Sequence, residues 1–216
     1  MNIDHLIARY PRIYHMAESG TWDSIRRRGL LSASAALDLL GITGGPRTPY
    51  EVQQRTTMMD VLPGHSDRIV LRDQKPMPPQ RLERALTDGT SPAEWYALIN
   101  SKVFFWAQEH RLLTLLNARD YRHREHDVLT IASETLVREH AARIRLCHMN
   151  SGNTWPMPLA RDAGIFQTIA NYPARRNGAP AKEVVEVVVD HSVPDIARHV
   201  IEVRRMKGTE VLATIA

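Results

Sequence analysis

The run Val184–Val189 restricts the fold of this chain more than any other segment, because five of its six residues are valines. β-Branched residues at this density predict a buried strand. Glu186 interrupts the run, and on a strand it shares a face with Val184 and Val188. Burial of an unpaired charge is costly, so Glu186 is expected to be paired, to face a cleft, or to lie exposed on an edge strand.

Other segments predict strands and helices that follow one another without regular alternation. Strands are expected at residues 12–16, 68–71, 103–106, 127–132, 143–147, 184–189, 200–203 and 210–215. Helices are expected at 21–28, 33–40, 92–100, 108–116, 133–140 and, as a short one, from 193 to 196, with an irregular region from 150 to 180. This order favours an α+β fold with a mixed or antiparallel sheet.

Length and composition restrict the class of protein. The 216 residues suit a single domain spanning residues 1–216, and no apolar stretch approaches the roughly 18 residues that a membrane span requires. The single cysteine, Cys147, excludes an internal disulfide and fits a reducing compartment, so a soluble cytoplasmic protein is expected. A net charge of +4 favours acidic partners such as a dinucleotide or nucleic acid, or serves solubility alone.

Two histidine-containing segments are candidates for chemistry. His15 ends the first expected strand, where its ring is either presented to a ligand or held half-buried in the fold. His123 and His126 have helical spacing but lack a third ligand, so this segment is interpreted as a solvated charged turn and no metal is expected. The chain has neither a phosphate-binding glycine loop nor a Gly-x-Ser-x-Gly elbow, which disfavours doubly wound nucleotide folds.

Three separated segments, taken in order, resemble the signature regions of ADP-ribosyltransferases and are most similar to those of DarT-type enzymes, which modify nucleic acids. The first is Tyr14–Ala17 followed by Arg28–Ser32, the second is Val103–Trp106, and the third is Glu186–Val189 followed by Val193-Pro194. The resemblance implies an ADP-ribosyltransferase-like split sheet, mixed or antiparallel, with surrounding helices.

The same resemblance assigns roles in binding NAD, which is a substrate in this family. Glu186 would be the catalytic carboxylate that orients the nicotinamide ribose and stabilises the positive charge that develops as nicotinamide leaves. His15, with Tyr14 beside it, would hold the ribose and amide region of NAD. Phe104 or Phe105 would stack on nicotinamide.

An arginine also belongs to the site in many members of the family. Arg72, within Arg72-Asp73-Gln74, and Arg55 are both candidates, and Arg72 is preferred as the catalytic one.

The segment before Glu186 is where the resemblance places the element that meets the acceptor. Basic and aromatic residues alternate there, which suits an unstacked base and its phosphates. The expected nucleic-acid contacts are Trp155, Arg161, Arg175 and Arg176. Alternatively, this is a surface loop whose aromatic residues only pack it.

The expected function is therefore NAD-dependent transfer of ADP-ribose to a nucleic acid, or to a protein, with release of nicotinamide. A toxin or phage-defence role, with an antitoxin or immunity partner, is part of what the resemblance implies. Two alternatives remain open: NAD hydrolysis or RNA 2′-phosphotransfer by a related enzyme, and a non-catalytic nucleic-acid-binding domain.

Overall fold

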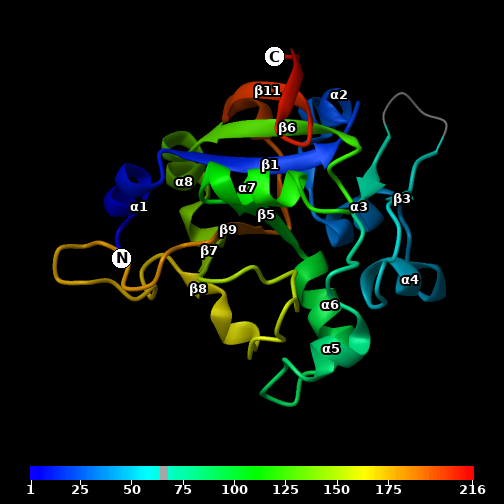
Figure 1. Cartoon of the computed structure of the whole chain (residues 1–216), viewed down its shortest axis with the longest axis horizontal. Coiled ribbons are helices and arrows are strands. Elements are labelled where there is room, and N and C mark those ends of the chain that lie inside the picture. Colours follow the sequence, from blue (N-terminus) through cyan, green and yellow to red (C-terminus); the bar gives the residue numbers. More distant parts are fainter. Residues whose placement is uncertain (64–67) are drawn as a thin grey trace.

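The chain folds around one eight-stranded sheet, shown in a computed structural model that describes residues 1–63 and 68–216 (Figure 1). The strand order is β12-β11-β6-β1-β5-β9-β7-β8, and each described pair in it is antiparallel. Helices lie on both faces of this sheet, so the expected α+β class is confirmed.

The sheet strands are β1 (Arg12–Glu18), β5 (Lys102–Trp106), β6 (Glu125–Ala132), β7 (Ile144–Cys147), β8 (Gln167–Thr168), β9 (Glu186–Asp190), β11 (Val200–Lys207) and β12 (Glu210–Thr214). Two short antiparallel pairs lie outside this sheet: β2 (Leu30–Leu31) with β10 (Ser192–Val193), and β3 (Met59–Asp60) with β4 (Val70–Leu71). The α-helices are α1 (Ile3–Arg9), α2 (Trp22–Arg28), α3 (Ala33–Leu39), α4 (Thr48–Glu51), α5 (Pro79–Glu83), α6 (Pro92–Asn100), α7 (Glu109–Leu116) and α8 (Ser133–His140). Short 3-10 helices are η1 (Gly45–Arg47), η2 (Ala141–Arg143), η3 (Ala163–Ile165) and η4 (Ile196–Arg198).

The two faces of the sheet are covered in different ways. On one face a continuous core joins Ile13, Phe105 and Val187 of the sheet to α1, α2 and α8. On the other face there are two separate clusters: α7 packs over β1, β6 and β11, and α6 packs beside Phe104 and Cys147 of β5 and β7. The space between these two clusters is where the cavity described below opens.

The sheet is split at its centre, between β1 and β5. These strands share one described residue pair, Tyr14 opposite Trp106, whereas β1 and β6 pair from Arg12 to Glu18. β5 likewise pairs with β9 along its whole length. Beyond Tyr14, the residues of β1 therefore separate from those of β5, and the sheet behaves as two half-sheets joined at one point.

Local sequence features account for several element ends. The capping box at Ser91 is present and starts α6, as predicted. α2 ends at Gly29 with a φ of 87°, as expected, but the Thr21 hydroxyl donates to the Glu18 carbonyl instead of capping the helix. The short helix expected from residue 193 begins only at Ile196, because Ser192–Val193 pairs with β2.

Among the described residues, no helix has the length and apolar composition to cross a membrane.

Candidate functional site

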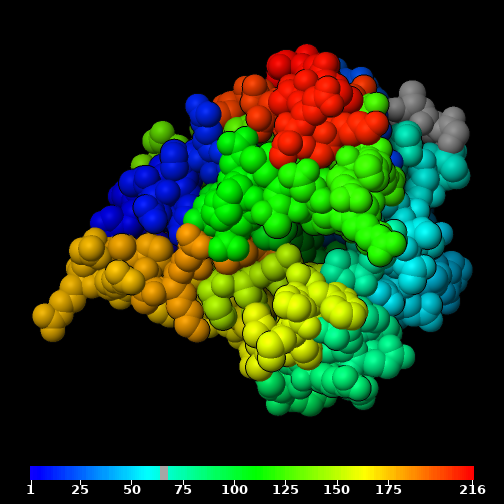
Figure 2. Space-filling model, viewed as in Figure 1, coloured from blue at the N-terminus to red at the C-terminus, as the bar shows by residue number. Residues whose placement is uncertain are grey.

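A cavity of about 740 Å³ opens where the two half-sheets separate. Figure 2 shows a hollow between the segment that carries α7 and the segment around residue 160. Side chains from four distant parts of the chain line this cavity: His15 of β1, Arg72 just after β4, Phe104 of β5 and Glu186 of β9. The volume falls in the range of about 300–1,000 Å³ that is typical of small-molecule sites.

Glu186 lies inside the sheet and not on its edge. β9 is flanked by β5 and β7, so Glu186 has Trp106 opposite it on one side and Cys147 on the other, and its exposure is 5%. The Ser151 backbone N–H donates to both carboxylate oxygens, at 3.2 and 3.3 Å. Burial raises the pKa of Glu186 to about 7, against the lowering effects of Ser151 and Arg161. The alternative of an exposed edge position is wrong.

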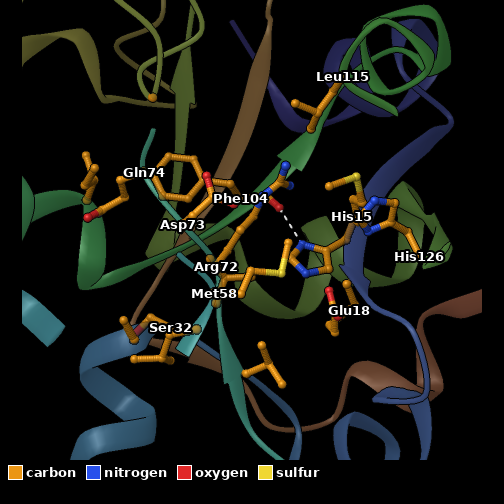
Figure 3. A pocket seen from close by; sticks show the side chains of 18 of the residues that line it. His15, Glu18, Ser32, Met58, Arg72, Asp73, Gln74, Phe104, Leu115 and His126 are labelled. Atoms are coloured by element: carbon orange, nitrogen blue, oxygen red, sulfur yellow. Dashed lines mark hydrogen bonds between the residues drawn. The ribbon is translucent and has the colours of Figure 1, made fainter. Parts of the chain in front are cut away.

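His15 spans the gap in the split sheet. Its Nδ1 lies 2.8 Å from the carbonyl oxygen of Phe104, and since a carbonyl only accepts hydrogen bonds, Nδ1 carries the proton and donates (Figure 3). Burial lowers the pKa of His15 to about 4, with a further lowering from the nearby charge of Arg72. The ring is therefore neutral at pH 7, and Nε2 is left as an acceptor for a ligand hydroxyl.

The two candidate arginines have different surroundings. The Arg72 guanidinium lies 4.6 Å from the ring centre of Tyr121, and Figure 3 shows it beside His15 and Phe104. Within residues 1–63 and 68–216, no carboxylate forms an ion pair with Arg72. Arg72 thus offers the cavity a positive charge that a ligand anion can neutralise.

Arg55 is instead held by the protein itself. Its guanidinium donates to the Arg72 carbonyl and to the Asn100 side chain, both at 2.9 Å, and also to the Tyr50 carbonyl. Burial lowers its pKa to about 10. These contacts fix the segment that carries Arg72, so the role of Arg55 is to position that segment.

The aromatic residues of β5 divide between the two faces of the sheet. Phe104 and Trp106 stand opposite Val188 and Glu186, so both share a face with the carboxylate. Phe105 points into the core on the other face, where its ring meets that of His15 edge-on at 5.8 Å. Phe104 and Trp106 are thus the residues placed to stack on a flat ligand ring, and Trp106 was not among the predicted site residues.

Tyr14 does not line the cavity. It packs at the margin of the cluster beneath α7, which contains Met16 and Leu112. The structure therefore does not bring Tyr14 to the cavity with His15.

His126 is a cavity residue that the sequence did not reveal. It is fully buried on β6, and burial together with the charge of Arg72 lowers its pKa to about 4. The expected solvated turn is wrong at this position, because β6 begins at Glu125, two residues earlier than predicted. Its neighbours Val128 and Met206 lie in the same apolar environment.

Trp155 lies at the edge of the cavity and is 56% exposed. The guanidinium of Arg81 lies 3.6 Å from its ring centre and is itself held by the carbonyls of Thr154 and Pro156, at 2.6 and 2.7 Å. The Trp155 ring is therefore held in place while much of its surface stays open to a partner.

The expected basic contacts of this region are not brought together at the cavity. Arg175 and Arg176 lie on an exposed loop that extends past the amino terminus (Figure 1) and lie outside the cavity lining. Arg161 is 2% exposed and donates to main-chain carbonyls, so the expectation that it touches a nucleic acid is wrong.

A buried cluster of His140, Asp195 and His199 has the composition of a metal site, and its ligand atoms lie within 4.8 Å of one another. Arg143 donates to Nδ1 of His140, at 2.8 Å, so the proton of that ring is on Nε2. This Nε2 donates to Asp195 at 2.8 Å, and Nε2 of His199 lies 3.1 Å from the same carboxylate. The cluster is thus a hydrogen-bond network that joins α8 to the segment around η4.

Together these features define an α+β protein with a ligand-sized cavity at a split in its sheet, containing a buried carboxylate, a neutral histidine and an arginine that has no ion pair within the described part of the chain. The chain belongs to a family of unknown function, DUF7002, which matches residues 11–200. The match runs from the start of β1 to the first residue of β11 and includes each cavity residue discussed above. No curated protein matches the chain.

Proposed function

We propose that this protein is an NAD-dependent ADP-ribosyltransferase that uses Glu186 as its catalytic carboxylate. One observation carries the proposal: the three segments that resemble the signature regions of these enzymes contribute His15, Phe104 and Glu186 to a single cavity. A strand-forming sequence pattern alone would not require such convergence, because His15 and Glu186 lie far apart in the sequence.

The reaction breaks the bond between nicotinamide and its ribose, and the electron pair of that bond leaves with nicotinamide. The ribose then carries positive charge at its C1 carbon, and the ionised Glu186 stabilises that charge from a water-poor site. The acceptor attacks C1 and loses a proton. With a pKa of about 7, Glu186 is suited to receive that proton at neutral pH.

The other cavity residues have complementary roles in this proposal. Nε2 of His15 accepts a hydrogen bond from a ribose hydroxyl, because Nδ1 is already committed to Phe104. Arg72 pairs with the pyrophosphate, whose charge it is free to neutralise. Phe104 or Trp106 stacks on nicotinamide, on the face that they share with Glu186.

The acceptor in this proposal is a nucleic acid. Its support is the exposed ring of Trp155 at the cavity edge, which an unstacked base would cover with a gain of about 1–3 kcal/mol. The proposal includes a cytoplasmic location, with which the single free cysteine, Cys147, is compatible.

The decisive experiment measures nicotinamide release and label transfer from NAD in the presence of DNA, RNA or cell lysate. Wild type is compared with Glu186→Gln, which preserves shape but removes the charge, and with Glu183→Gln as a matched control. Glu183 is exposed and paired with Arg111, outside the cavity. We expect Glu186→Gln to lose at least about 100-fold in rate and Glu183→Gln to remain active.

The outcomes also separate the alternatives. Nicotinamide release that is independent of any acceptor would indicate NAD hydrolysis, and release that requires an RNA 2′-phosphate would indicate phosphotransfer. A flat tryptophan-fluorescence titration with NAD, despite binding of nucleic acid, would overturn the proposal and favour a non-catalytic binding domain.

A further inference from the structure

We propose that Arg161 is a positioning residue that fixes the orientation and the charge of Glu186 through the main chain of Ser151. The positioning of Glu186 by Arg161 is argued from contacts in the structure alone. Only its consequence for catalysis rests on the proposed function.

The first step is the geometry of the buried guanidinium. Arg161 donates from Nη1 to the Ser151 carbonyl at 2.8 Å, from Nη2 to the Asn153 carbonyl at 2.7 Å, and from Nε to the Leu159 carbonyl at 3.1 Å. A guanidinium offers its donors in one rigid plane, so binding three carbonyls at once holds residues 151, 153 and 159 of the loop relative to one another.

The second step leads from this loop to the carboxylate. The N–H of Ser151 is the donor that reaches both oxygens of Glu186, and the carbonyl of the same residue is held by Arg161. The loop has no helix or strand to hold Ser151 at this distance from β9. Thr154 and Arg81 also anchor this loop, and Arg161 is the side chain that holds the Ser151 carbonyl and so keeps the Ser151 N–H in front of the carboxylate.

The third step is electrostatic. Arg161 is a buried cation whose charge lowers the pKa of the buried Glu186 carboxylate, against the larger raising effect of burial. The neighbouring groups are the Cys147 thiol of β7 and the hydroxyl and amide of Ser151, and the Trp106 side chain of β5 carries no charge. Loss of the Arg161 charge should therefore leave Glu186 harder to ionise.

The test follows the Glu186 carboxyl by NMR titration of protein labelled in its glutamate side chains, and so needs no enzymatic activity. In Arg161→Gln we expect the Glu186 midpoint to rise by about one pH unit or more, whereas Arg161→Lys, which keeps the charge, stays closer to wild type. Arg81→Gln is the matched control, because Arg81 binds two carbonyls of the same loop without contacting the Ser151 carbonyl. An unchanged midpoint in Arg161→Gln would overturn the proposal.

A second measurement on unaltered Arg161 covers the case in which Arg161→Gln does not fold. In the wild type, the Ser151 amide and the Arg161 Nε signals should both titrate with the Glu186 midpoint near 7, and both should be flat in Glu186→Gln. Signals that do not titrate in the wild type would contradict the coupling. If the coupling is found but NAD is not consumed, the proposed function fails while the role of Arg161 stands.

Discussion

The imidazole of His15 donates from Nδ1 to the carbonyl of Phe104 across the point where β1 and β5 separate. This bond replaces the main-chain ladder that the two strands do not form beyond Tyr14. It also fixes the tautomer of a ring that faces the cavity, so one side chain both closes the sheet and offers Nε2 to a ligand.

Substitution of His15 should separate these two contributions. An asparagine amide can reproduce the donor at the position of Nδ1 but has no acceptor at the position of Nε2. We expect His15→Asn to retain most of the stability and His15→Ala to lose about 1 kcal/mol. Both should bind NAD at least about tenfold more weakly, as measured by urea unfolding and tryptophan fluorescence. Wild-type NAD affinity in His15→Ala would contradict the role of Nε2.

Glu186 should make the stability of the chain depend on pH. Its pKa is about 7 in the folded state and 4.5 ordinarily. Between pH 4.5 and pH 7, the folded state therefore holds a proton on Glu186 that the unfolded state has lost. The stability that this proton provides is fully present below pH 4.5 and is lost as the pH rises through 7. The difference corresponds to about 3 kcal/mol.

Glu186→Gln removes that dependence. Relative to wild type, we expect the variant to be similar near pH 4 and more stable at pH 8, as measured by thermal unfolding across the pH range. Glu183→Gln, at an exposed and ion-paired position, should show no gain at pH 8. Equal pH profiles for wild type and Glu186→Gln would mean that the carboxylate is solvated.

The network around Asp195 should stabilise the fold without a metal. Asp195 accepts from both His140 and His199, so Asp195→Ala leaves two buried rings without their partner. We expect a loss of about 2 kcal/mol or more, measured by chemical denaturation. Glu139→Gln, an exposed partner of Arg198, should change stability little. A rise in Tm on addition of zinc to the wild type would contradict the hydrogen-bond assignment.

Gly29 should tolerate no side chain. Its φ is 87°, and a Cβ built there would lie 2.5 Å from Cα of Pro194. We expect Gly29→Ala to cost more than about 2 kcal/mol, because strain and a backbone clash add. Gly41→Ala is the control, since its φ of 65° is similar but no atom lies within 4 Å. Equal losses in thermal unfolding would show that the clash is relieved by movement of the Pro194 segment.

The sequence predicted the elements whose patterns are local. The capping box at Ser91 and the glycine after α2 lie where they were expected, and the valine-rich strand is present but begins at Glu186, two residues later than predicted. Helix α1 was not predicted, because its short amphipathic stretch depends on packing of Leu6 into the core.

The parts of the site that were missed depend on contacts between distant residues. The burial of Arg161 follows from three carbonyls of its own loop, and a basic residue in a loop gives no sign of that in the sequence. His126 was misplaced because the polar residues before it hide the start of β6.

The single contact between the half-sheets at Tyr14 and Trp106 has a mechanical consequence. A molecule bound in the cavity would contact both half-sheets at once and restrain their motion relative to each other. Occupancy and rigidity of the whole sheet would then rise and fall together, so the empty protein would be free to flex about this pivot and the filled one would not.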